Sequence, residues 1–361
     1  MKKLLILIIT IFLTSGCYDY VELNDLSIIS GIAVDYKDDK YVVTYEILND
    51  QKKQDSISEK AIIVSKSGKT IAEAFNNTTE EIAKKPYYAH LKCVVISEEI
   101  AEEKLENLID YFLRKTDIRS EFDTVIAKDI SAKKLLDSNN KNNPVISDLI
   151  ESLLENNKYY KNNTKTNPFE EMVTDILIFG EEAKMAVIKK DDDNLKIDGI
   201  GLFNDYKLQG IITKDNAITY NVLTGNALNA SYTTKCNNNN NETLTFAIYE
   251  SKPKININNN KINIDVKADA NIVESNCNYN FKDTKTYKKL NKEYSKLLEK
   301  KINKFITTTL ELDSDILGIR RIYYNKYRIK NNDIWKLLDY KVNVDFKINK
   351  KGLIFEVNND N

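Results

Sequence analysis

The chain has 361 residues, of which 42% are hydrophobic and 30% are charged, and its 53 basic and 54 acidic residues give a formal net charge of −1. This length exceeds one ordinary hydrophobic core, so we expect two or three domains. Acidic and basic residues are interleaved rather than gathered in blocks, which disfavours a nucleic-acid-binding protein, and we expect no nucleic acid partner.

The first sixteen residues have the layout of a secretory signal. A positively charged start precedes the apolar run Leu4 to Leu13, in which only Thr10 is not hydrophobic. A helix of this length is about 15 Å long, against a hydrocarbon core of roughly 30 Å, so the run is too short to span a bilayer. The next residues, Leu13-Thr14-Ser15-Gly16-Cys17, are similar to a lipobox, although Thr14 stands where leucine is usual.

We therefore expect residues 1–16 to be removed and Cys17 to carry lipid that tethers the chain to the outer face of a membrane. Two acyl chains, at about 0.8 kcal/mol per buried methylene, hold a protein firmly, whereas one chain binds only marginally. The alternative is an ordinary signal peptide that happens to carry a cysteine. No later stretch approaches eighteen apolar residues, so nothing after Cys17 is expected to cross the membrane.

The first half of the mature chain is expected to mix strands and helices. Thr70 and Glu73 form a capping box ahead of an apolar stripe, and Ser97 opens a second stripe, so a helix is predicted after each. Short β-rich runs precede and separate these helices, and the first two runs are joined by a charged hairpin turn. The predicted strands are 27–36, 41–48, 61–65, 91–96 and 123–128, and further helical segments are predicted at 132–136, 145–154 and 169–178.

The pattern changes after the acidic group Asp191-Asp192-Asp193, which is interpreted as a linker with a domain boundary near residues 191–196. Residues 197–203 and 207–213 are expected to form a hairpin. In residues 284–310 the apolar positions step by three or four, which predicts one long amphipathic helix packed across a sheet. The remaining predictions are strands at 243–249, 255–257, 262–273 and 340–348 and a short helix at 315–319.

These elements predict an α+β fold of several small mixed domains with antiparallel sheets. The last domain is expected to pack its long amphipathic helix on a sheet. We divide the chain into a signal peptide at 1–16, an N-terminal region at 17–195 and a C-terminal α+β domain at 196–361. The N-terminal region is open to a further division into 17–120 and 121–195.

Cysteine usage does not predict a disulfide framework. Once Cys17 carries lipid, three cysteines remain, and an odd number does not form a set of pairs. Cys93 lies in an apolar run. Cys236 and Cys277 are able to pair outside the cell, but their spacing carries no geometric information, so buried or free thiols are favoured over a bridge.

No enzyme signature is found, and we expect no catalytic residues, no metal and no cofactor. His90 is the single histidine, which excludes a two-histidine metal site, and there is no Gly-x-Ser-x-Gly elbow. Gly68-Lys69-Thr70 is similar to the end of a phosphate-binding loop, but Ile63 stands where the motif requires glycine, so helix capping is favoured. Paired carboxylates of a hydrolase acting on cell-wall glycan remain the enzyme alternative.

The predicted long helix has a basic face. A solvated face opposite a buried stripe is the favoured interpretation, and anionic lipid headgroups or an acidic partner are the alternatives. The lysines are Lys285, Lys288, Lys289, Lys292, Lys296, Lys300, Lys301 and Lys304, against Glu293 and Glu299.

Several segments occur in the order of a known family. They are Cys17 to Asn24, Gly31 to Asp35, His90 to Glu98, Tyr111 to Arg119, Gly201 to Gly210, and Ser314 to Gly318 followed by Trp335. Together they resemble the Ger(x)C lipoproteins, the C subunits of nutrient germinant receptors in spores of bacilli and clostridia. Tyr18 replaces the tryptophan that is usual in that family.

The resemblance implies a non-enzymatic, lipid-anchored subunit on the outer face of the spore inner membrane. It implies assembly with integral membrane A-type and B-type subunits into a receptor that starts germination, and a body of three small α+β domains. The positions that match family motifs, besides the lipidated Cys17, are Asp19, Glu22, His90, Arg114, Arg119, Asp315 and Gly318.

The competing class is the solute-binding lipoprotein of a transporter. Such proteins need two lobes around a ligand cleft, usually built on repeated βαβ units. The hairpin-rich start and the absence of repeated βαβ units from the predicted element order argue against this class.

Overall fold

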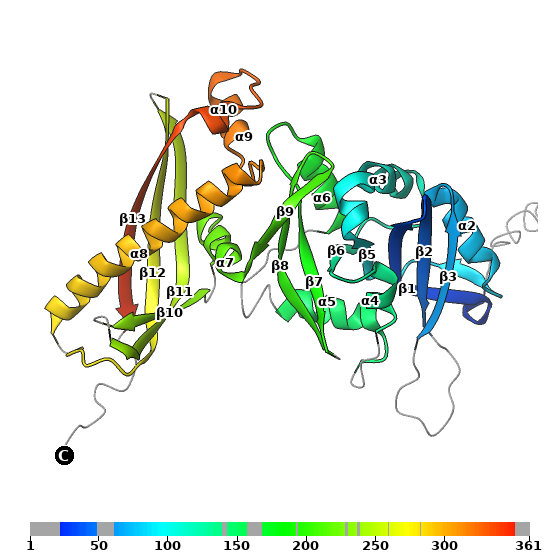
Figure 1. The fold of residues 1–361 in the computed structure, drawn as a ribbon, viewed down its shortest axis with the longest axis horizontal. Coiled ribbons are helices and arrows are strands. Elements are labelled where there is room, and N and C mark those ends of the chain that lie inside the picture. The colour runs from blue at the N-terminus through cyan, green and yellow to red at the C-terminus, as the bar shows by residue number, and fades with distance from the viewer. Residues whose placement is uncertain are drawn as a thin grey trace, which may run out of the picture.

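The computed structural model describes residues 22–48, 61–138, 143–156, 168–192, 194–227, 230–236, 239–258, 260–281 and 283–350. Cys17 and Asp19 lie outside the described residues, and so does the predicted signal peptide. Two β-sheets with their helices lie side by side along the long axis of the molecule (Figure 1). None of the described helices is long and apolar enough to cross a membrane.

The first sheet is mixed. Among the described residues its strand order is β3-β2-β1-β5-β6-β7-β8-β9, with β4 paired to β1. The pairs β1·β5, β5·β6 and β6·β7 are parallel, whereas the hairpins at both ends of the sheet are antiparallel. The strands are β1 (Leu26–Lys37), β2 (Lys40–Ile47), β3 (Ile62–Gly68), β4 (Lys85–Tyr87), β5 (Cys93–Ser97), β6 (Asp123–Lys128), β7 (Lys184–Asp191), β8 (Asn194–Asn204) and β9 (Lys207–Thr213).

Helices cover both faces of this sheet, so its central strands are buried on both sides. In β5, Val94 and Ile96 belong to one apolar core, and Cys93 and Val95 belong to the core on the opposite face. The first core takes residues of α2 (Ile71–Glu80), α3 (Leu105–Arg114) and α6 (Phe169–Leu177), and the second takes residues of α4 (Ala132–Leu136) and α5 (Ile146–Asn156).

Two buried carboxylates on the first hairpin cap helices that are distant in sequence. Asp35 accepts hydrogen bonds from the backbone N–H groups of Ala132 and Lys133, at 2.7 and 2.8 Å, where α4 begins. Glu46, which has no exposed surface, accepts from the N–H groups of Ile146 and Ser147, at 2.5 and 3.0 Å, where α5 begins. Burial raises the pKa of the Glu46 carboxyl. These contacts satisfy N–H groups that a helix start leaves unpaired, and they hold both helices against the sheet.

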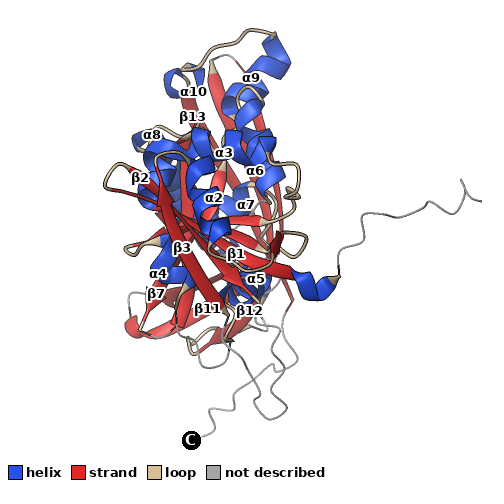
Figure 2. Ribbon diagram, turned by 90° about the vertical axis from the view of Figure 1, so that its right-hand side faces the viewer, coloured by secondary structure: helices blue, strands red, loops and turns tan. Residues whose placement is uncertain are grey.

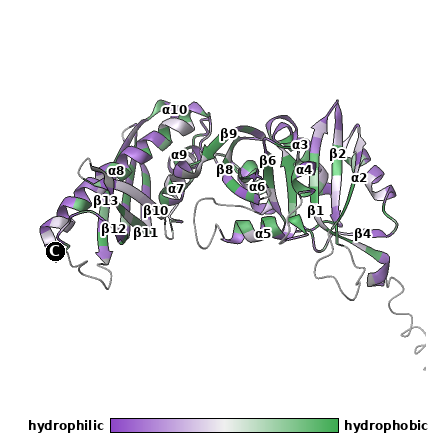
Figure 3. Cartoon of the chain, turned by 60° about the horizontal axis from the view of Figure 1, so that its bottom comes forward, coloured by the Kyte–Doolittle hydropathy of each residue, from purple (hydrophilic) through white to green (hydrophobic). Residues whose placement is uncertain are grey.

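The second sheet has the described strand order β10-β11-β12-β13, and β12 and β13 are parallel. The long helix α8 (Thr284–Glu311) packs on it through a stripe that includes Leu290, Tyr294, Leu298 and Phe305, and much of α8 is coloured as hydrophilic in Figure 3. The other elements are α7 (Lys214–Leu223), β10 (Ala230–Cys236), β11 (Asn239–Asn258), β12 (Lys261–Ser275), α9 (Ile319–Tyr327), α10 (Ile334–Leu337) and β13 (Asp339–Lys350).

The predicted α+β class is confirmed, with parallel strand pairs added to the expected antiparallel ones. The long helix predicted at 284–310 is confirmed at Thr284–Glu311, and the predicted hairpins are present. The helix predicted at 315–319 is wrong, because residues 314–318 form a turn and α9 begins at Ile319. The units β5-α3-β6 and β6-α4-α5-α6-β7 are consecutive crossovers between parallel strands. The chain therefore does contain βαβ units, and their expected absence was wrong as an argument against a solute-binding lipoprotein.

The predicted boundary region, residues 191–196, includes the turn between β7 and β8. These two strands pair antiparallel, with Asp191 opposite Asn194, and the backbone of Asp192 turns through φ 53°. The first sheet therefore continues through this region as far as β9. The division of the chain into domains stays a prediction.

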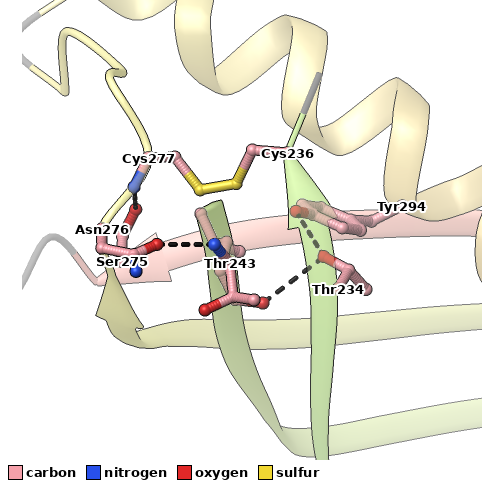
Figure 4. The surroundings of a disulfide bond; sticks show 8 residues. Thr234, Cys236, Thr243, Ser275, Asn276, Cys277 and Tyr294 are labelled. Carbon is pink, nitrogen blue, oxygen red and sulfur yellow. Dashed lines mark hydrogen bonds between the residues drawn. A yellow bond between two sulfur atoms is a disulfide. The ribbon is translucent and has the colours of Figure 1, made fainter. Parts of the chain in front are cut away.

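Cys236 and Cys277 form a disulfide, so the preference for free thiols at these two positions was wrong. Cys236 ends β10 and Cys277 follows β12, and Figure 4 shows their sulfurs joined beside α8. Their Cα atoms are 6.1 Å apart, a normal separation for a bridge. The pairing of β10 with β11 and of β11 with β12 brings the two residues together, which their sequence spacing could not reveal. Cys93 is free and buried.

Candidate functional site at the junction of the two sheets

The structure brings together two of the predicted motif positions, Asp315 and Gly318. Both lie in the turn between α8 and α9, against the link that connects α6 to β7. Because α6 and β7 belong to the first sheet and its helices, whereas α8 packs on the second sheet, this turn forms the junction between the two parts of the molecule (Figure 1).

A buried cluster of charged groups crosses the junction. The Nη2 atom of Arg320 lies 2.5 Å from Oε1 of Glu182, and its Nε atom lies 3.4 Å from Oδ2 of Asp315. The hydroxyl of Ser314 lies 2.6 Å from Oε2 of Glu182 and 2.8 Å from the backbone oxygen of Phe203. Glu182, Ser314, Asp315 and Arg320 are all buried. We call these four residues the junction cluster.

The turn at residues 315–318 depends on backbone geometry as well as on charge. Asp315 accepts hydrogen bonds from the N–H groups of Ile319 and Arg320, at 2.9 and 2.7 Å, and so caps α9. Gly318 has φ 65°, which favours glycine. Facing it, Gly180 has φ 81°, and a Cβ atom there would lie only 2.4 Å from the backbone nitrogen of Arg321. The α6–β7 link and the first turn of α9 are thus in direct backbone contact.

Burial raises the pKa of Glu182 and the pKa of Asp315, each to about 7, although the Arg320 guanidinium opposes this effect. The Ser314 hydroxyl donates to Oε2 of Glu182, which also opposes the rise in pKa because this hydrogen bond stabilises the charged carboxylate. Burial outweighs these contacts, so two carboxyl groups beside one guanidinium favour uptake of one proton near neutral pH.

Two cavities border the α6–β7 link, and both are lined by Ile178 and Glu181. The larger, of about 460 Å³, also has Asp313, Trp335 and Lys336 in its wall, and Lys336 forms an ion pair with Asp313. The smaller cavity has a volume of about 340 Å³. It is also lined by Asp175, Glu182, Lys184, Tyr220 and Leu317, and Nζ of Lys184 lies 2.8 Å from Oδ2 of Asp175.

The other predicted motif positions that the structure describes lie on the surface of the first part and do not contact the junction cluster. Glu22 is exposed, and its backbone oxygen accepts from the N–H of Asp25. His90 is exposed, with its ring 6.0 Å from that of Tyr87. Arg114 is exposed and paired with Asp110 on the same helix, and Arg119 is exposed. Sequence reasoning missed Glu182 and Arg320, which are 138 residues apart.

The junction cluster predicts a pH dependence of stability. The pKa values of Glu182 and Asp315 in the folded state exceed their ordinary values, so their contribution is full below about pH 4 and is lost as pH rises through about 7. Between pH 8 and pH 5, uptake of one proton by the pair should raise this contribution by about 3 kcal/mol. Urea unfolding at a series of pH values measures it.

The matched control for this prediction is Glu182→Gln, which keeps hydrogen-bonding atoms at the same place but cannot ionise. We expect a flatter pH profile for the variant. Identical profiles for the variant and the unchanged chain would contradict the assignment of the titration to the junction cluster.

The fold is that of a protein already solved. The structure described as that of the GerBC protein matches with a TM-score of 0.54 and 20% identity, over 91% of this chain and 99% of that chain. The two-sheet α+β architecture is therefore one that a solved structure also has.

The sequence matches two family models, the spore germination protein N-terminal domain over residues 19–190 and the spore germination B3/GerAC-like C-terminal region over residues 198–352. The chain therefore belongs to the family of germinant receptor C subunits, and its role is in spore germination. It is 23% identical to spore germination protein GerQC of Bacillus cereus, over 98% of this chain and 99% of that protein. It is 24% identical to spore germination protein B3 of Bacillus subtilis (strain 168), over 94% and 95%.

Proposed function

We propose that the chain is the lipid-anchored, non-enzymatic C subunit of a nutrient germinant receptor, on the outer face of the spore inner membrane. The observation that carries this proposal is the match of both family models in sequence order behind an apolar leader that ends in Leu13-Thr14-Ser15-Gly16-Cys17. The leader is too short to span a bilayer, so lipid on Cys17 is the attachment that we infer.

In this proposal the subunit acts as a scaffold for the integral membrane A-type and B-type subunits. Lipid tethering confines the body to the plane of the membrane and so raises its effective concentration for those partners. The junction cluster supports such a role, because buried hydrogen bonds between the two parts oppose their rotation relative to each other. A body with one fixed shape presents the same surface to its partners each time.

The test is a Cys17→Ala substitution in the producing organism. We expect mass spectrometry of the unchanged chain to find residues 1–16 removed and a diacylglyceryl group on Cys17. The variant should leave the membrane fraction, and germination in response to nutrients should be strongly reduced. A variant that is released from the membrane and still supports full germination would eliminate the scaffold proposal, and an unmodified Cys17 thiol would eliminate the anchor.

Isothermal titration calorimetry against amino acids separates the scaffold from the solute-binding alternative. If the chain is a scaffold, titration of an amino acid into this chain alone should release little heat. Tight binding of one amino acid would favour the alternative.

A further inference from the structure

The segment that connects α9 to β13 projects at one end of the second sheet. We call residues 325–337 the α9–α10 tip, and in Figure 1 they lie at the top of the molecule. Residues 325–330 are exposed without interruption, and they read Asn-Lys-Tyr-Arg-Ile-Lys. Arg328, with φ 60°, turns the chain at the end of α9. Basic and apolar side chains therefore alternate on a protruding turn.

Large apolar side chains gather at this tip. Tyr327 is 41% exposed, Ile329 is 55% exposed and Leu337 is 72% exposed. Leu177, which is 68% exposed at the end of α6, borders the same cavity as Trp335 and Lys336. The other strongly exposed large apolar side chains of the described residues are scattered over four separate elements, namely Ile62 on β3, Tyr87 on β4, Leu113 on α3 and Val273 on β12.

Two basic side chains of the tip, Arg328 and Lys330, are available to a ligand, whereas Lys326 donates to the backbone oxygen of Ile257 and Lys336 pairs with Asp313. Within the described part of the chain no ion pair neutralises Arg328 or Lys330, and Lys330 lies over the ring of Phe179, 5.2 Å from its centre. Asp333 is the one acidic residue between positions 325 and 337. Cations interleaved with exposed aromatic and aliphatic side chains suit the boundary between lipid headgroups and acyl chains, where the cations contact phosphates and the apolar groups leave water.

We propose that the α9–α10 tip binds the surface of an anionic phospholipid bilayer. Tyr327, Ile329 and Leu337 enter the boundary between headgroups and acyl chains, and Arg328 and Lys330 contact the phosphates. The inference rests on the proposed function for its setting, because a lipidated Cys17 would already hold the chain at a membrane. A second contact fixes the orientation of the body, which one flexible lipid attachment leaves free.

The arrangement of the molecule is compatible with two contacts on one membrane. In the view of Figure 2, the short 3-10 helix η1 (Leu23–Asp25), which precedes β1, and the far end of α9 both reach the right-hand side of the molecule. The basic face of α8 is a weaker candidate for the membrane. Among the described residues of α8, no large apolar side chain is strongly exposed beside its outer lysines, which include Lys289, Lys292 and Lys296.

The test uses the mature chain with Cys17→Ser, so that no lipid is attached. The probes are phosphatidylcholine vesicles with about one-third phosphatidylglycerol, and vesicles of pure phosphatidylcholine, in a sedimentation assay. We expect binding to the anionic vesicles and much weaker binding to the neutral ones. The double variant Ile329→Asp with Leu337→Asp should lower the partition coefficient at least about tenfold.

Val273→Asp is the matched control, because Val273 is 62% exposed on β12, away from the tip, and this variant should bind like the unchanged chain. Circular dichroism checks that each variant is folded. Absence of binding to anionic vesicles overturns the proposal, as does equal binding by the tip variant. Loss of binding in a variant with Lys289→Glu, Lys292→Glu and Lys296→Glu, but not in the tip variant, overturns it in favour of α8. Since the assay uses unlipidated protein, none of these outcomes depends on whether Cys17 carries lipid in the cell.

Discussion

Replacing Arg320 by methionine should destabilise the protein by about 3–5 kcal/mol, the range found when one partner of a buried ion pair is removed. The variant leaves Glu182 and Asp315 buried without the cation that both of them contact. Methionine retains much of the volume and the flexible apolar stem of arginine, so lost packing contributes little. Urea unfolding at pH 8, where the carboxyl groups are most ionised, gives the largest difference.

Arg321→Met is the matched control for this prediction. Arg321 is the next residue of α9 and is partly exposed, and no ion pair joins it to another described residue. We expect its substitution to change stability by less than about 0.5 kcal/mol. Equal effects at the two positions would show that the junction cluster has no special role.

A double variant distinguishes charge from shape at the junction. If an uncompensated charge destabilises Arg320→Met, then adding Glu182→Gln should recover a large part of the loss, because it removes one of the two buried carboxylates. Independent effects that simply add would point to packing instead. Together with the single variants, the double variant gives the coupling energy between Glu182 and Arg320, whose Oε1 and Nη2 atoms lie 2.5 Å apart.

Elements with a strong local signal were predicted correctly from the sequence. Thr70 caps α2 as its capping box predicted, since its hydroxyl accepts from the N–H of Glu73 at 3.1 Å. The apolar stripe of α8 was equally clear, because a long helix on one sheet repeats its buried positions every three or four residues.

Elements without such a signal were missed. In α7 every residue from Ala217 to Leu223 is buried, so no polar face marks it as a helix. The strand β10 consists largely of small and polar residues that do not alternate strongly in hydrophobicity. Where tertiary contacts bury all sides of a segment, the periodicity that sequence reasoning depends on is lost.

Sequence reasoning has the same limit at the junction cluster. Asp315 and Gly318 were identified only through their resemblance to family motifs, and nothing in the sequence linked them to Glu182. The pairing of Glu182 with Arg320 depends on how the two sheets meet, and no local spacing encodes a contact across 138 residues. The caps that Asp35 and Glu46 supply to α4 and α5 were missed for the same reason, since each spans about a hundred residues.

Removing the disulfide should cost about 4 kcal/mol of stability. The bridge closes a loop with a sequence separation of 41, and the loss of chain entropy in the unfolded state scales with the logarithm of that length. The substitutions Cys236→Ala and Cys277→Ala test this without burying a new hydroxyl group at Cys236, which is almost fully enclosed. We expect urea unfolding to begin at lower denaturant concentration, with the ends of β10 and β12 losing protection from hydrogen exchange first.

A reducing agent provides the internal control. It should destabilise the unchanged chain by about the same 4 kcal/mol and leave the double variant unaffected, because Cys93 is free in both proteins. An unchanged chain that is insensitive to reduction would contradict the bridge. Because structural disulfides persist mainly outside the reducing cytosol, stability that depends on this bond is what we expect of a chain folded beyond the membrane, as the proposed export requires.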